Sequence, residues 1–182
     1  MKLIVGLGNP GEQYKNNRHN VGHLFVEYLA EKLSELSAPT WKHDKYLLSD
    51  ICTVSSDVVL AKPATYMNKS GEAVRKLMEK WNLTTESLVV VHDDLDIPIG
   101  KFRIVEGYGP KLHNGIESIE NHLHKNDFVR VRIGVDNRPP ENRIPGIDYV
   151  LQDFTSQEIH MIPGIFESIL SLLKTENHIH IE

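Results

Sequence analysis

The sequence predicts a single α/β domain built on a twisted mixed β-sheet flanked by helices. Its 182 residues suit one compact domain. Short apolar, β-branched runs that end in glycine or polar turns alternate with segments that repeat apolar residues at helical spacing. No repeat, low-complexity tract or long linker divides the chain. We therefore expect one domain over residues 1–182, with about five to seven strands.

The first predicted elements are a buried strand and a helix separated by a polar segment. Residues 2–5 are apolar and β-branched, and the run stops at Gly6. Residues 12–19 are polar and show no period. From Val21 onward apolar residues recur at helical spacing, and Asn20 is suited to cap the helix that they predict.

The middle of the chain is predicted to add three strands and a second helix. Residues 45–54 and 58–62 indicate two strands joined by a polar turn. Apolar residues on one face predict a helix over about 70–81. Residues 88–91 form a further buried run, which we expect to end at the acidic cluster 92–96.

Two strands and two helices complete the predicted domain. Strands are expected over 101–105 and 128–135, with a short helix over 116–124 between them. The last helix should begin near Thr155, because the run T-S-Q-E fits a capping box. Pro163-Gly164 should kink or interrupt this helix.

The composition is typical of a globular protein in a reducing compartment. Apolar residues make up 40% and charged residues 25% of the chain. No apolar stretch approaches the ~20 residues that a membrane helix needs, and the N-terminal apolar run is too short for a signal peptide. Cys52 is the only cysteine, which excludes an intrachain disulfide framework. We expect a cytoplasmic monomer that does not contact membranes.

The net charge of −5 argues against a protein that binds nucleic acid through its whole surface. Eight basic and six acidic residues lie within 101–143, so this segment carries +2 and the remainder −7. Charged residues usually form only a solvated face. The asymmetry is nevertheless compatible with one face that meets phosphate.

A glycine-rich run, Gly6-Leu7-Gly8-Asn9-Pro10-Gly11, follows the first predicted strand. It matches the G-x-G-x-x-G pattern by which dinucleotide-binding folds hold pyrophosphate at a helix N-terminus. The polar residues that follow start no helix, and the acidic residue expected ~20 positions on would fall near Glu27 or Glu31, inside a predicted helix. A turn that reverses the chain is a better interpretation, and a nucleotide-dependent oxidoreductase is kept as an alternative.

Together with the residues after it, this run resembles the opening signature of bacterial-type peptidyl-tRNA hydrolases. The signature continues with Tyr14 and then Arg18-His19-Asn20-Val21-Gly22. Further family-like motifs follow in order, and they are Lys62-Pro63-Ala64-Thr65-Tyr66-Met67-Asn68-Lys69-Ser70-Gly71, His92-Asp93-Asp94-Leu95-Asp96-Ile97-Pro98-Ile99-Gly100, His113-Asn114-Gly115, Arg132-Ile133-Gly134-Val135 and Asp148-Tyr149-Val150-Leu151. The resemblance covers residues 1 to about 155. It implies hydrolysis of the ester bond between peptide and tRNA, with the acceptor end and nascent peptide of peptidyl-tRNA as partners and with no cofactor.

Such a reaction needs a base with a near-neutral pKa, a group that orients it, and donors for developing oxyanion charge. A histidine in a polar loop is more often a surface residue than a catalyst, but the resemblance implies that His19 is the base that activates water without a covalent intermediate. A carboxylate at the end of a buried strand can fix the tautomer of a base. The residues alone leave Asp93, Asp94 and Asp96 open, and the resemblance assigns this role to Asp93. No ligand cluster predicts a metal, and no G-x-S-x-G run predicts a serine nucleophile.

Three asparagines complete the candidate site, although asparagine is equally common in turns and caps. By resemblance, Asn9 joins His19 and Asp93 as a catalytic residue and senses the acylated nitrogen, so that peptidyl-tRNA is cleaved rather than free aminoacyl-tRNA. Asn68 and Asn114 are implied to hold the peptide backbone and the attacking water. The resemblance adds substrate contacts from Tyr14, Tyr66 and the adjacent Met67. The alternative for Tyr66 and Met67 is that they are ordinary core or rim residues. We expect supporting roles for His92 and His113.

Basic side chains could steer tRNA through its phosphates without reading its sequence. The candidates are Lys101, Arg103, Lys111, Arg130 and Arg132. Either arginine of the 128–135 strand could instead face solvent or a carboxylate.

One segment departs from the family pattern. The family is normally glycine-rich before the histidine that corresponds to His113, whereas this chain has Lys111 and Leu112 there, and Pro110 stiffens the loop. If the loop gates the cleft, substrate affinity and opening should change more than the chemistry. A further alternative is therefore a non-catalytic RNA binder whose cleft is closed by the loop over 107–112.

Overall fold

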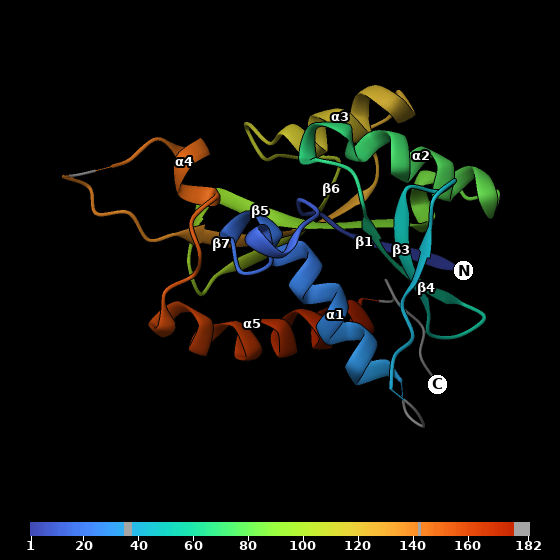
Figure 1. Cartoon of the computed structure of the whole chain (residues 1–182), viewed down its shortest axis with the longest axis horizontal. Coiled ribbons are helices and arrows are strands. Elements are labelled where there is room, and N and C mark those ends of the chain that lie inside the picture. Colours follow the sequence, from blue (N-terminus) through green and yellow to red (C-terminus); the bar gives the residue numbers. More distant parts are fainter. Residues whose placement is uncertain (35–37, 142, 177–182) are drawn as a thin grey trace.

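A computed structural model describes residues 1–34, 38–141 and 143–176, and the strands within these ranges form one seven-stranded sheet (Figure 1). The strand order is β2-β3-β4-β1-β5-β7-β6. The central strands β4, β1, β5 and β7 run parallel. Strands β3 and β6 pair antiparallel with β4 and β7, and the edge strand β2 pairs antiparallel with β3. The predicted single domain on a mixed sheet is therefore confirmed. The rest of the predicted range 1–182 lies outside the described residues.

The elements alternate along the chain as the sequence predicts. The strands are β1 (Lys2–Gly6), β2 (Lys42–Asp44), β3 (Ser49–Thr53), β4 (Val58–Pro63), β5 (Leu88–Pro98), β6 (Phe102–Glu106) and β7 (Val129–Asp136). The helices are α1 (Val21–Leu33), α2 (Ser70–Lys80), α3 (Asn114–Leu123), α4 (Gly146–Val150) and α5 (Ser156–Thr175). No helix of this described part is long and apolar enough to span a bilayer.

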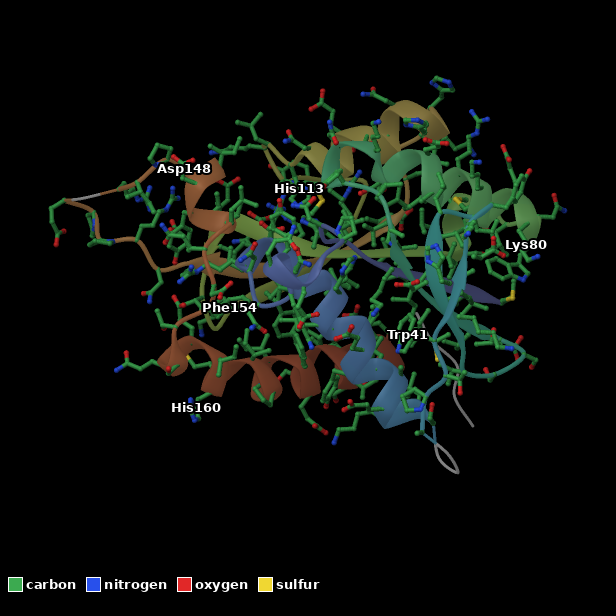
Figure 2. All side chains as sticks on the ribbon, viewed as in Figure 1. Trp41, Lys80, His113, Asp148, Phe154 and His160 are labelled. Atoms are coloured by element: carbon green, nitrogen blue, oxygen red, sulfur yellow. The ribbon has the colours of Figure 1, made fainter. Side chains whose placement is uncertain are left out.

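Two hydrophobic cores cover the two faces of the sheet. Alternate residues of each central strand point to opposite faces, so Ile4 packs with α1 and α5 while Leu3 packs with α2 and α3. In the side-chain view, Phe154 lies on the α5 side of the sheet and His113 on the α3 side (Figure 2). The sheet is thus buried on both faces, as parallel strands require.

Two predicted strand boundaries were wrong. The segment over 45–54 is not one strand, because residues 45–48 form a turn and the chain before it supplies the short strand β2. The buried run over 88–91 does not end at the acidic cluster, since β5 continues through it to Pro98. Asp93 and Asp94 have partners inside the protein and Asp96 is exposed to solvent, so the strand can include all three carboxylates.

The capping box at the start of α5 is confirmed. The Thr155 side chain accepts from the Glu158 backbone N–H, and the Glu158 side chain accepts from the Thr155 backbone N–H. The expected interruption at Pro163 is wrong, because α5 is continuous to Thr175. Buried residues before and after the proline, including Ile162 and Phe166, hold both halves against the same core. That packing outweighs the lost backbone hydrogen bond.

Candidate active site

Asp93 lies in the middle of the sheet, on β5 between β1 and β7. Strand β1 ends at Gly6, and β5 runs past this end, so the β5 residues after Val91 stand at the carboxyl edge of the β1 strand. Open α/β sheets place their ligand sites at this edge. Asp93 is 2% exposed and therefore needs partners within the protein.

His19 reaches Asp93 from a short 3-10 turn, Arg18–Asn20, whose two other residues hold the turn in place. The buried guanidinium of Arg18 donates to the carbonyl oxygens of Gln152 and Asp153 and pairs with Glu158 at 2.6 Å. Asn20 donates its amide to the Asn9 carbonyl and accepts from the Asn9 N–H, both at 2.9 Å. The imidazole between them is consequently carried on a rigid support.

Asn20 occupies the N-cap position of α1 as expected, but the expectation that its side chain caps the helix is wrong. The side chain makes no cap hydrogen bond because Asn9 takes both of its polar atoms. The N–H of His23, in the first turn of α1, donates to the Leu7 carbonyl instead.

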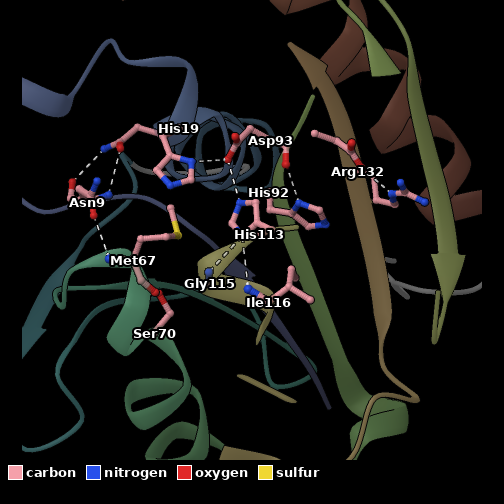
Figure 3. Close-up of polar contacts among 12 residues, drawn as sticks. Asn9, His19, Met67, Ser70, His92, Asp93, His113, Gly115, Ile116 and Arg132 are labelled. Atoms are coloured by element: carbon pink, nitrogen blue, oxygen red, sulfur yellow. Dashed lines mark hydrogen bonds and ion pairs between the residues drawn. The ribbon is translucent and has the colours of Figure 1, made fainter. Parts of the chain in front are cut away.

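One carboxylate oxygen of Asp93 bonds two imidazoles (Figure 3). Oδ1 lies 2.8 Å from His19 Nδ1 and 2.9 Å from His113 Nε2. Of the three aspartates that the sequence left open, Asp93 is therefore the one that meets His19. Asp94 pairs with Arg132 instead, and the Asp96 side chain is exposed.

The hydrogen bonds determine which ring nitrogens carry protons. His113 Nδ1 accepts from the backbone N–H groups of Gly115 and Ile116, so its Nε2 carries the hydrogen donated to Asp93. An ionised Asp93 can only accept, so His19 donates from Nδ1 and keeps a lone pair on Nε2. The His19 side chain is 13% exposed, and it lines the cleft described below.

The same contacts shift the pKa values of the pair. Burial lowers the pKa of His19, but the charge of Asp93 and its hydrogen bond raise that pKa by more, so the net shift is upward. Burial raises the pKa of Asp93, and the two imidazoles more than reverse this, so its pKa lies well below the usual range. Neighbouring His92 is fully buried, and burial followed by repulsion from His113 holds its pKa well below the ordinary value.

The structure also fixes the orientation of the Asn9 amide. Its Oδ1 accepts from the Met67 backbone N–H at 2.8 Å, which distinguishes the oxygen of the amide from its Nδ2 donor (Figure 3). The residue is 8% exposed, and Asn20 binds both of its backbone polar groups. Asn9 is thus a rigidly held donor.

A cleft of about 350 Å³ opens beside His19 and Asp93. Polar groups line one part of it, including His113 and the exposed Asn114 at the start of α3. The rest of the lining is apolar or glycine and comes from Leu95, Leu112, Gly146, Ile147 and Val150. Sites with apolar walls and a few convergent polar groups are typical of ligand binding.

The structure brings only part of the predicted site to this cleft. His19, Asp93 and Asn114 line it, and Asn9 lies on the other side of His19 (Figure 3). Met67 is buried beneath Asn9, which it contacts through its backbone N–H. The remaining substrate candidates are absent from the lining of this cleft, and Asn68 and Tyr66 are exposed while Tyr14 is partly exposed.

The five basic candidates divide into two groups. Lys101, Arg103 and Lys111 are exposed. Arg130 is fully buried and pairs with Glu120 at 2.6 Å, and Arg132 is 5% exposed and pairs with Asp94 at 2.6 Å. These two arginines meet carboxylates, the outcome that the sequence left open, and neither presents its charge to solvent as a phosphate contact requires.

His19, Asp93 and His113 offer ligand atoms that all lie within 4.8 Å of one another, close enough to consider a metal ion. The hydrogen bonds do not suit one. Coordination by His113 Nε2 would require its proton to move to Nδ1, and a protonated Nδ1 could no longer accept from the two backbone N–H groups. The two donors of Asp93 Oδ1 would also be displaced. His19, Asp93 and His113 therefore form a hydrogen-bonded group that does not suit metal coordination.

The glycine-rich run does not form a dinucleotide site. A three-residue 3-10 turn, Glu12–Tyr14, follows Gly11, and the first α-helix begins only at Val21. A side chain at Gly6 would meet the Gly22 carbonyl oxygen at 2.1 Å, so these glycines allow α1 to lie against β1. The run serves close packing and the placement of Asn9.

Sequence reasoning missed two contributions to the site. It gave His113 only an unspecified supporting role, although this residue shares the Asp93 oxygen and caps α3. It treated Asn20 as a helix cap, although Asn20 holds Asn9. Both residues lie within the family-like motifs over 18–22 and 113–115, and that is the signal that could have singled them out.

The fold and this site together define an α/β protein in which a buried carboxylate holds an imidazole at the carboxyl edge of the sheet. Comparison with known proteins identifies its family. The family model described as peptidyl-tRNA hydrolase matches residues 3–179. The chain belongs to this family.

Individual relatives agree with this assignment. The peptidyl-tRNA hydrolase of Pseudothermotoga lettingae is 44% identical over 92% of this chain and 85% of its own length. That of Bacillus cereus is 43% identical over 93% of this chain and 87% of its own. The crystal structure of peptidyl-tRNA hydrolase from Acinetobacter baumannii superposes with a TM-score of 0.83 at 34% identity, covering 96% of this chain and 87% of that one.

Proposed function

We propose that this protein hydrolyses the ester bond of peptidyl-tRNA by direct attack of water, with His19 as general base. The observation that carries the proposal is the hydrogen bond between His19 Nδ1 and Asp93 Oδ1, which leaves the Nε2 lone pair for a water molecule. When that water loses its proton, His19 becomes a cation beside the buried carboxylate. Asp93 stabilises this cation and holds the ring in place. When the tetrahedral intermediate collapses, its bond to the ribose oxygen breaks and the proton held by His19 passes to that oxygen, so tRNA leaves with a free hydroxyl and His19 is neutral again. No covalent enzyme intermediate forms.

Asn9 supports a preference for N-blocked substrates on electrostatic grounds. Because its Oδ1 already accepts from the Met67 N–H, Asn9 has its N–H donors left for a ligand. The carbonyl oxygen of a peptide bond next to the esterified residue can accept from such a donor. Free aminoacyl-tRNA carries an ammonium group at that place, which is itself a donor and a cation. Peptidyl-tRNA should therefore bind in a productive orientation, and aminoacyl-tRNA should not.

Asn114 and Asn68 are proposed to hold the peptide main chain and the water, since Asn114 lines the cleft and Asn68 is exposed near Met67. Tyr14 and Tyr66 are proposed as further substrate contacts. For the tRNA phosphates we retain the exposed side chains Lys101, Arg103 and Lys111. A monomer acting in the cytoplasm is the setting that fits this substrate and a single cysteine.

The proposal is tested with the purified full chain and tRNA that carries an N-acetylated amino acid. We expect release of the N-acetyl amino acid with chelator present and no release from the same tRNA carrying the free amino acid. Binding of tRNA without turnover would overturn the proposal in favour of a non-catalytic RNA binder. Equal cleavage of both substrates would overturn the assigned role of Asn9.

A further inference from the structure

The cleft beside His19 has an apolar wall that the proposed chemistry does not use. Leu95 of β5 and Val150 of α4 form its floor, and Leu112 and Ile147 stand at its rim. Leu112 is 91% exposed and Ile147 is 67% exposed, although both border the cleft. Large aliphatic side chains left in water at the rim of a concave site are typical of ligand contact.

This wall lies next to the reacting atoms. His19 and Asp93 line the same cleft, whose volume is about 350 Å³. A substrate whose ester carbon is one water molecule away from His19 can place only its nearest groups there. These groups are the side chain of the esterified residue, its main chain, and the ribose with the terminal base.

The chemistry of the wall favours the side chain among these groups. All four wall residues are aliphatic and offer no hydrogen bonds from their side chains. The edge of a base carries ring nitrogens and an amino group that lose hydrogen bonds to water when they are buried against such a surface. An apolar amino-acid side chain has no hydrogen bonds with water to lose, and burying its surface against the wall is favourable.

Resting on the proposed function, we propose that this wall binds the side chain of the peptide residue esterified to tRNA and gives the enzyme a preference for apolar residues at that position. Leu112 is the specificity-determining residue. It is the most exposed member of the wall, so it has the most surface to lose on binding. A glycine at this position would remove one side of the wall.

The test compares two N-acetylated substrates on the same tRNA body, one carrying leucine and one carrying asparagine, whose side chains have nearly the same shape. For the unmodified protein we expect kcat/KM to favour the leucyl substrate by about tenfold. Leu112→Ala should reduce this preference to about twofold or less by slowing the leucyl substrate alone. Ile147→Ala should act in the same direction.

Leu172→Ala is the matched control, since Leu172 is also a partly exposed leucine but lies on α5, outside the cleft lining. It should keep the full preference. An equal fall for both substrates in Leu112→Ala would overturn the inference, because the wall would then bind a group that the substrates share. Equal kcat/KM values for the unmodified protein would overturn it as well. If neither substrate is cleaved, the proposed function itself fails.

Discussion

The side-chain oxygen of Asn9 accepts the backbone N–H of Met67, and this bond decides what Asn9 can offer a substrate. Its N–H donors are left for a substrate, so the residue suits a carbonyl oxygen better than an ammonium group. The donor N–H comes from a residue 58 positions further along the chain, and this contact explains how a loop asparagine keeps one orientation.

Asn9→Asp should reverse this preference in part. The carboxylate has no donor for the substrate carbonyl, and its charge attracts an ammonium group. We expect kcat/KM for N-acetylated substrate to fall by about 10²–10³, while cleavage of free aminoacyl-tRNA falls less. The ratio of the two rates is the measurement. An unchanged ratio would show that selectivity arises elsewhere.

The raised pKa of His19 predicts the pH dependence of the reaction. The base acts only when it is neutral, so activity should rise with pH through the pKa of His19 in the free enzyme. Since Asp93 raises that pKa, the midpoint of the acidic limb of kcat/KM should lie above the ordinary value of about 6.5. In Asp93→Asn, burial still lowers the pKa of His19 but the charge that raises it is gone, so the midpoint should move to lower pH. The rate should fall by about 10²–10⁴. An acidic limb that does not move would exclude His19 as the titrating base.

His113 has two roles that substitutions can separate. Its Nδ1 caps α3, and its Nε2 donates to Asp93. His113→Ala loses both and should destabilise the protein by about 0.5–2 kcal/mol in denaturant unfolding. His113→Asn keeps a capping acceptor, so its stability should remain near that of the unmodified protein, whereas its kcat should fall by roughly tenfold. Full activity in His113→Asn would mean that His19 alone suffices to orient Asp93.

The exposed and buried arginines should respond oppositely to substitution. Arg132→Leu leaves the buried Asp94 carboxylate without its partner, and we expect a loss of about 3–5 kcal/mol in the free energy of unfolding. Arg103→Ala should leave the unfolding free energy unchanged, weaken tRNA binding, and reduce the slope of log affinity against log salt by about 1. The proposed phosphate face would be contradicted if Arg103→Ala bound tRNA as well as the unmodified protein at every salt concentration.

Local patterns were sufficient for most elements of this fold, although they predicted neither β2 nor α4. The helical spacing after Val21 and the capping box at Thr155 each depend on residues within a few positions, and both helices begin where expected. The errors occurred where distant residues decide. The strand β5 continues through its acidic cluster because Arg132 neutralises Asp94 and two histidines bind Asp93, and no local pattern contains those pairings.

The candidate site shows the same division. The resemblance of the motifs singled out His19, Asp93 and Asn114, and the structure brings these three to one cleft. The sequence could not reveal that the two arginines of β7 pair with carboxylates. Alternation along a strand shows which residues share a face of the sheet, but it does not show what packs against that face. The apolar wall was also out of reach, since α4 and the loop before α3 meet only in the folded chain.

The most direct test of the central claim is the single-turnover rate of His19→Ala with N-acetylaminoacyl-tRNA, measured beside His43→Ala as a control for loss of an exposed histidine that also pairs with an aspartate. The account predicts that His19→Ala loses about 10²–10⁴ in rate, that added imidazole restores part of it, and that His43→Ala keeps the full rate. A His19→Ala protein that folds and cleaves at the unmodified rate would contradict the role of this imidazole as the base.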